Sequence, residues 1–77
     1  MNRKEYFETL TKAVESMDVD TFREFARKYK PLMYKATDEV LEITMRKVAL
    51  YLPTINADIK EQAREWLISR GSDTSIF

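Results

Sequence analysis

The chain has 77 residues, enough for one small domain, and 44% of them are hydrophobic, which argues against disorder. Cysteine and histidine are both absent, which excludes disulfides and thiolate metal sites and removes the commonest general base and metal ligand. Thirteen acidic and thirteen basic residues cancel, so no net charge draws the chain to nucleic acid or to a membrane.

No apolar run approaches the roughly 20 residues that cross a bilayer. The first ten residues are rich in charge and lack the apolar segment of a secretory signal. We therefore expect a soluble cytoplasmic protein that does not act on a membrane, with no cofactor and no bound metal.

The first predicted helix covers residues 2–17, where apolar residues recur at intervals of three and four. They form one stripe that we expect to face the core: Tyr6, Phe7, Leu10, Ala13, Val14 and Met17. On the outer face, Glu8 and Lys12 have the i,i+4 spacing of a favourable ion pair.

The second predicted helix covers residues 19–29. Asp18 or Asp20 can cap its N-terminus, and Thr21 with Glu24 has the spacing of a capping box. Its expected buried residues are Phe22, Phe25, Ala26 and Tyr29. Pro31 then prevents simple continuation, because proline lacks an N–H and restricts the residue before it.

Residues 32–36 fit two interpretations. Pro31 can be the first residue of a long helix that reaches Leu52, because proline is tolerated at the first helical position. Alternatively, a short turn ends at Thr37 or Asp38, and that residue caps a separate helix. We favour the second interpretation, since the sequence Thr-Asp-Glu at this point is a good helix start.

The helix predicted for residues 37–52 carries two apolar stripes. Ile43 and Leu50 lie together on one side. The other side is a broad arc of seven residues: Val40, Leu41, Thr44, Met45, Val48, Tyr51 and Leu52. A helix with two apolar stripes usually has neighbours on two sides, so we expect this helix to be the central one.

The last predicted helix covers residues 57–70, with Asn56 as its N-cap and Gly71 just beyond its C-terminus. Its expected buried stripe is Ile59, Ala63, Trp66 and Leu67, and we expect Trp66 and Tyr51 to anchor the core.

Strand signals are missing from the sequence. The sequence therefore predicts an all-α fold: one domain of residues 1–77, built as a compact bundle of four helices, or of three helices and a short turn. Neighbouring helices are expected to be antiparallel with short loops, and residues 72–77 form a tail.

No motif in the sequence specifies a reaction. Asp18 and Asp20 resemble the start of a calcium-binding loop, but Phe22 and Arg23 occupy the positions of a ligand and of a glycine. The carboxylate pairs on the last two predicted helices are typical of a solvated helix face. We expect a protein that is not an enzyme, with no catalytic, cofactor-binding or metal-ligating residue and no small-molecule substrate.

The stretch 23–35 has a local excess of positive charge and contains two tyrosines. Such a patch can contact phosphates while a tyrosine stacks on a base. The candidate residues are Arg23, Arg27, Lys30 and Lys35 for phosphates and Tyr34 for stacking. The simpler interpretation is that Lys28 pairs with Glu24 and that the other charges form a solvated face.

Surplus apolar residues provide the second candidate surface. Ile43 and Leu50 cannot share a face with the broad arc, and Ile76 and Phe77 add two large apolar side chains in the tail. These four residues are candidates for a protein interface; alternatively, the bundle buries the Ile43 stripe and the tail docks on the core.

We expect the protein to be a non-enzymatic interaction module, a regulator or adaptor that binds another protein or itself as a homodimer. The alternative is a nucleic-acid-associated regulator that contacts phosphates through residues 23–35.

Overall fold

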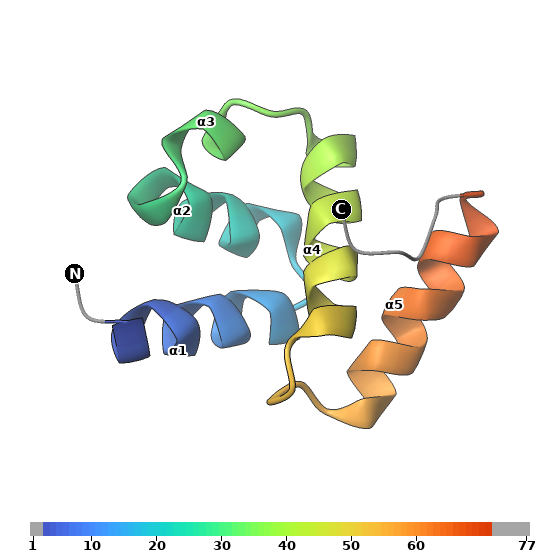
Figure 1. Ribbon diagram of the computed structural model, residues 1–77. Coiled ribbons are helices and arrows are strands. Elements are labelled where there is room, and N and C mark those ends of the chain that lie inside the picture. The colour runs from blue at the N-terminus through green and yellow to red at the C-terminus, as the bar shows by residue number, and fades with distance from the viewer. Residues whose placement is uncertain (1–2, 72–77) are drawn as a thin grey trace.

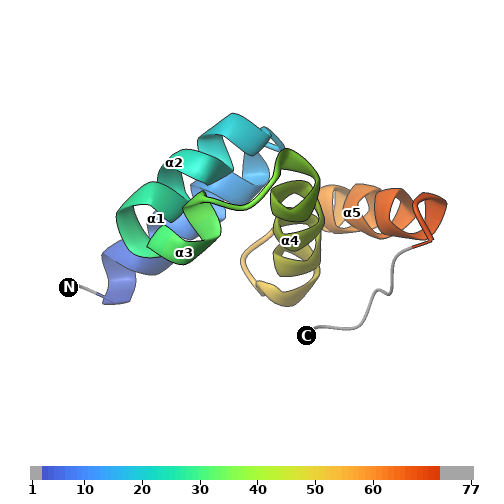
Figure 2. The same ribbon diagram turned by 90° about the horizontal axis from the view of Figure 1, so that it is seen from above.

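The computed structural model describes residues 3–71, which form helices and no strand. The helices are α1 (Arg3–Glu15), α2 (Val19–Tyr29), α3 (Pro31–Tyr34), α4 (Asp38–Tyr51) and α5 (Ala57–Ser69). Helix α4 stands between α1, α2 and α3 on one side and α5 on the other (Figure 1), and the view from above shows the same division (Figure 2). The predicted all-α bundle is confirmed. No helix within these residues combines the length and apolar character that a bilayer crossing requires.

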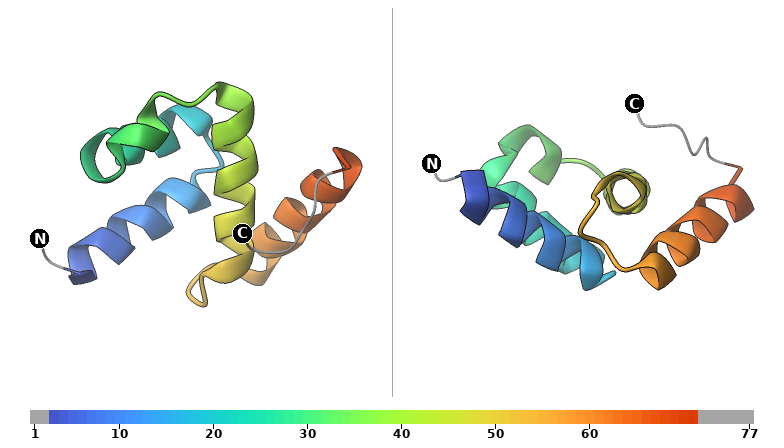
Figure 3. Two further views of the ribbon diagram at one scale, coloured as in Figure 1. Left: turned by 45° about the horizontal axis from the view of Figure 1, so that its top comes forward. Right: turned by 60° about the horizontal axis from the view of Figure 1, so that its bottom comes forward.

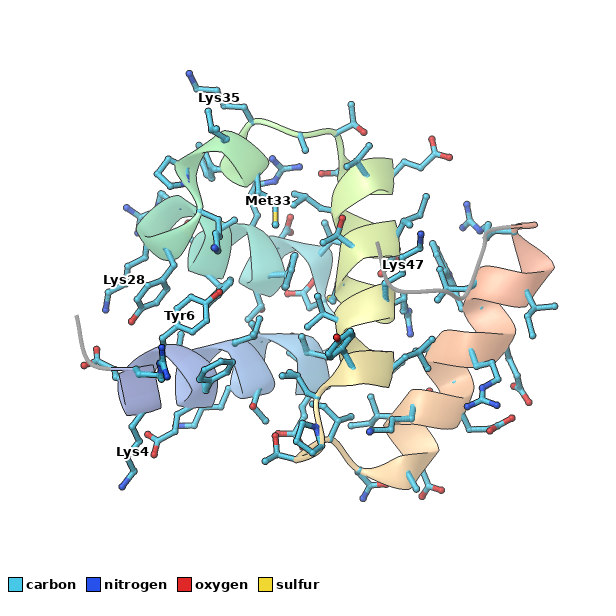
Figure 4. The ribbon with its side chains drawn as sticks, viewed as in Figure 1. Lys4, Tyr6, Lys28, Met33, Lys35 and Lys47 are labelled. Carbon is cyan, nitrogen blue, oxygen red and sulfur yellow. The ribbon has the colours of Figure 1, made fainter. Side chains whose placement is uncertain are left out.

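Helices α1 and α2 run antiparallel to each other, and α4 crosses beside their adjoining ends (Figure 3). Ring contacts join α1 to α2, since the centroid of the Tyr6 ring lies 5.5 Å from that of Phe25 and 5.2 Å from that of Tyr29. Tyr6 points from α1 toward α2 (Figure 4). Such aromatic pairs add to the free energy gained from burial alone.

The core draws buried apolar side chains from α1, α2, α4 and α5, whereas α3 contributes none that is fully buried. Phe22, Leu41 and Met45 are among the largest completely buried side chains. Ile55 is also buried, although it belongs to the loop between α4 and α5. It immediately precedes Asn56, the cap of α5, and apolar residues at that position commonly pack against the start of the helix.

The buried stripe of α4 differs from the predicted arc. It is centred on Leu41, Met45 and Ala49, whereas Val40 is 49% exposed and Tyr51 is 61% exposed. Helix α4 contacts α1 and α2 as well as α5, so the expected neighbours on two sides are confirmed. Val40 and Tyr51 lie more than a quarter turn around the helix from Met45, beyond the covered surface. The prediction that Tyr51 anchors the core is therefore wrong.

Two members of the stripe predicted for α1 also lie outside the core. Phe7 is 46% exposed, because its neighbour Tyr6 takes the position that faces α2. Helix α1 ends at Glu15, two residues earlier than predicted, and Met17 adopts a left-handed conformation with φ of 55°. This conformation redirects the chain from α1 into α2, so Met17 does not extend the helical stripe.

The start of α4 decides between the two interpretations of the segment after Pro31. Pro31 is the first residue of α3, which has only four residues. The hydroxyl oxygen of Thr37 then accepts a hydrogen bond from the N–H of Val40 at 3.3 Å and caps α4. The favoured interpretation, a short turn followed by a separate helix, is confirmed.

Helix α5 begins and ends where its capping residues predict. The side-chain oxygen of Asn56 accepts a hydrogen bond from the N–H of Asp58 at 2.7 Å. Gly71 follows the helix with φ of 69°, a left-handed conformation that suits glycine. At the start of α2, Asp18 occupies the N-cap position, but its carboxylate accepts a hydrogen bond from the hydroxyl of Thr21 at 2.8 Å instead of from the backbone.

The substitution Leu41→Ala should lower the free energy of unfolding by about 2–5 kcal/mol, because it leaves a cavity at a completely buried position. Urea unfolding followed by circular dichroism measures this change. The matched control is Leu32→Ala, which removes the same atoms at a position that is 89% exposed and should cost less than about 0.5 kcal/mol. Equal losses in the two variants would contradict the central position of α4.

Candidate functional site

Arg23 joins α2 to the segment between α3 and α4. Its guanidinium donates hydrogen bonds to the carbonyl oxygens of Tyr34 at 2.6 Å and Ala36 at 3.0 Å, and it pairs with the carboxylate of Asp38 at 2.5 Å. Carbonyl groups at the end of a short helix have no partner within it, and Arg23 supplies one. This side chain, only 25% exposed, therefore serves the fold.

Two other cations of the basic stretch pair with carboxylates. The Arg27 guanidinium donates a hydrogen bond to Glu24 at 2.9 Å, and this bond with the nearby negative charge raises the pKa of Arg27 above its ordinary value. The Lys28 ammonium lies 3.6 Å from a carboxylate oxygen of Glu5 on α1. The predicted pairing of Lys28 with Glu24 is therefore wrong, because Glu24 faces Arg27.

The remaining candidates for nucleic-acid contacts differ in their surroundings. The Lys30 ammonium lies 5.8 Å from the centroid of the Tyr6 ring, within the range of a cation–π contact. Lys35 points from the end of α3 into solvent (Figure 4), and Tyr34 beside it is 38% exposed. Phosphate contact by these residues stays a prediction, but the fold does not gather the basic stretch into one unpaired patch.

The predicted protein-interface residues are only partly described. Ile43 and Leu50 are each half-buried on α4, and Leu50 packs against the core. Ile76 and Phe77 lie outside the described residues. The large apolar side chains that the structure leaves exposed are different ones: Phe7, Leu32, Tyr34, Val40, Tyr51 and Ile68.

Phe7 is one of these exposed residues, and it lines a groove. This groove, about 820 Å³ in volume, runs between α1 and the loop that joins α4 to α5. Leu52 and Pro53 provide the facing apolar wall. The hydroxyl groups of Thr11 and Thr54 lie 3.2 Å apart and connect α1 to the loop, so this contact holds the two walls of the groove together.

Charged residues of α1 border this apolar surface on one side. They are Lys4, Glu8, Lys12 and Glu15. Lys4 points away from α1 on the side opposite Tyr6 (Figure 4). One side of α1 therefore packs against α2, while the groove side carries both apolar surface and charge, the combination found at protein interfaces.

Sequence patterns alone assign Phe7 to the core, because it lies beside the stripe that includes Tyr6 and Leu10. One available sign was the adjacency of Tyr6 and Phe7, since consecutive residues on a helix point about 100° apart. The two rings therefore cannot both point toward the same neighbouring helix. Leu52 and Pro53 gave no comparable sign, because their position beside α1 depends on the whole fold.

A second cavity, of about 340 Å³, lies between the start of α4 and the end of α5. It is lined by Val19, Asp38, Glu39, Glu42, Trp66 and Arg70. Two of its carboxylates have partners, since Asp38 binds Arg23 and Glu42 binds Arg46 at 3.3 Å. Within residues 3–71, no group of three or more acidic side chains is arranged to hold a metal ion.

Trp66 provides the aromatic wall of this second cavity. The guanidinium carbon of Arg70 lies 4.6 Å from its ring centroid, and that of Arg46 lies 5.3 Å away. These cation–π contacts already use the ring that a ligand would need. Trp66 is only half-buried and lines this cavity, whereas the buried residues of α5 are Ala63 and Leu67, so the prediction that Trp66 anchors the core is wrong.

No protein-family model, curated protein or solved structure matches the chain. Its function is therefore inferred from its residues and their geometry. The groove beside α1 offers apolar surface that the described residues leave uncovered, whereas most cations of the basic stretch already have partners within the chain.

The substitution Arg23→Ala should lower the free energy of unfolding by about 1–3 kcal/mol, because the carbonyl groups of Tyr34 and Ala36 lose their donor. Urea unfolding again measures the change. Arg27→Ala, which removes the same charge from the same helix at an exposed position, should leave the unfolding midpoint unchanged. A stable Arg23→Ala variant would show that this residue does not hold α3 in place.

Proposed function

We propose that the protein is a non-enzymatic helical interaction module, a small cytoplasmic regulator or adaptor that binds another protein or a second copy of itself. The observation that carries this proposal is the groove beside α1, where Phe7 is 46% exposed opposite Leu52 and Pro53. Apolar surface in contact with water is unfavourable, and a partner that covers the groove removes it from water.

The surroundings of the groove support protein recognition. An exposed aromatic residue beside charged side chains resembles the anchors that supply most of the binding energy in protein interfaces. Glu8 and Lys12 lie on the open side of α1, where they can form ion pairs with a partner and select its orientation. We therefore propose α1 as the interaction surface in place of the predicted residues Ile43 and Leu50, which are half-buried.

A photo-crosslinking residue in place of Phe7 tests this proposal directly. We expect p-benzoylphenylalanine at this position, irradiated in cells that produce the protein, to form an adduct of defined mass that mass spectrometry identifies. The aromatic replacement preserves the apolar character of the groove wall. Purified partner should then bind Phe7→Ser at least about tenfold more weakly than the unchanged protein, as expected for the loss of an interface anchor.

The control carries the same photo-crosslinker at position 32, because Leu32 is apolar and 89% exposed but does not line the groove. We expect fewer and less specific adducts from this position. Equal adducts from both positions, or none from position 7, would remove the groove as the interaction surface.

The nucleic-acid alternative has less support, because Arg23, Arg27 and Lys28 are engaged within the chain. Labelled duplex and single-stranded oligonucleotides, titrated with the protein at low salt, should therefore show no increase in anisotropy at micromolar concentrations. Micromolar binding that weakens steeply with salt and is abolished by Lys30→Glu with Lys35→Glu would instead support phosphate contact by the basic stretch.

A further inference from the structure

The charges along the groove side of α1 alternate in sign. In chain order the residues are Lys4, Glu8, Lys12 and Glu15, at intervals of four, four and three. These intervals place all four near one side of the helix. The same side carries Thr11 and borders Phe7, so charge and apolar surface form one continuous strip.

With the two helices in register, this order of charges is complementary to itself in the antiparallel orientation only. When two such helices lie antiparallel, each positive residue of one meets a negative residue of the other. When they lie parallel and in register, like charges meet, which is unfavourable. A self-complementary surface of this kind is what a two-fold symmetric dimer requires, because each copy offers the same surface to the other.

We propose that the groove is occupied by α1 of a second copy of this chain, packed antiparallel against the first. This inference rests on the proposed function and names the partner. Lys4 of each copy lies opposite Glu15 of the other, and Glu8 lies beside Lys12 of the other. The midpoint of both pairs lies near residue 10, close to the middle of α1. A single antiparallel register therefore allows both pairs to form.

The same crossing also places the aromatic ring in the groove. The antiparallel arrangement brings Phe7 of the second copy to the C-terminal half of α1, close to Thr11. Thr11 contacts Thr54, so this half of α1 lies beside the loop that contains Leu52 and Pro53. The ring therefore packs against the apolar wall of the groove, and the symmetry repeats this contact at the other end.

The size of the contact indicates a reversible dimer. Helix α1 has 13 residues and is therefore about 20 Å long. A helix pair of this length, with one loop on each side, buries less than the about 800 Å² per partner that is common in stable complexes. The dimer should form at high protein concentration, and salt should weaken it by screening the ion pairs.

Sedimentation velocity of the full chain, over a range of concentrations at low and high salt, tests this arrangement. We expect the unchanged protein to form a dimer that high salt weakens. Glu8→Lys and Lys12→Glu should each raise the dissociation constant at least about tenfold, because each places like charges opposite one another. The double variant Glu8→Lys with Lys12→Glu should restore dimerisation, since its charges are again complementary in the antiparallel arrangement.

The matched control is Glu61→Lys on α5, which makes the same charge change at an exposed position that does not line the groove and should leave the dimer unchanged. Circular dichroism confirms that each variant stays folded.

A monomer at every concentration overturns the inference. So does a dimer that the two single variants do not weaken, or one that the double variant does not restore. If position 7 forms an adduct with a different protein and the chain is monomeric, only the assignment of a second copy as the partner is overturned. Absence of any adduct removes the proposed function as well.

Discussion

The burial of α4 along Leu41, Met45 and Ala49 is the constraint on which the arrangement of the other helices depends. Helices α1 and α2 contact α4 on one side and α5 contacts it on the other. A helix enclosed in this way cannot offer its main apolar stripe to a partner, and even the second stripe, at Ile43 and Leu50, is half-covered. Apolar surface that a partner can reach therefore lies on the outer helices and at the edges of α4, and on α1 it lines a groove.

Charged residues contribute to this fold more than the zero net charge suggests. Arg23 fixes the short helix α3 against α2 by binding backbone carbonyl groups, and Lys28 connects α2 to Glu5 on α1. Arg46 pairs with Glu42 and also contacts the ring of Trp66 on α5. Cations that look like a nucleic-acid patch along the sequence are therefore distributed among structural contacts, and this weakens the electrostatic argument for phosphate binding.

The groove side of α1 combines charge with exposed apolar surface. Its charges lie on the border of an apolar surface formed by Phe7, Leu52 and Pro53, and none of the described helices packs over them. Small domains bury a limited fraction of their surface, and oligomerisation is one way in which they gain more. A symmetric contact through α1 would add apolar burial at both ends of the helix, and it would explain why the charges alternate in sign along that side.

Local sequence determined the helices and most of their boundaries, because Thr37, Asn56 and Gly71 act on the backbone within one turn of their own positions. Pro31 likewise separated α2 from the next helix. The hydrophobic spacing also identified α4 as the central helix, since two stripes need two neighbours.

The sequence pattern did not indicate whether the ring of Tyr6 or that of Phe7 is covered, or which groups Arg23 binds. These depend on the angles at which helices cross and on the loop that brings Pro53 beside α1. The groove was decided by tertiary structure alone, because its two walls come from segments that are distant in the chain and meet only when α4 is buried.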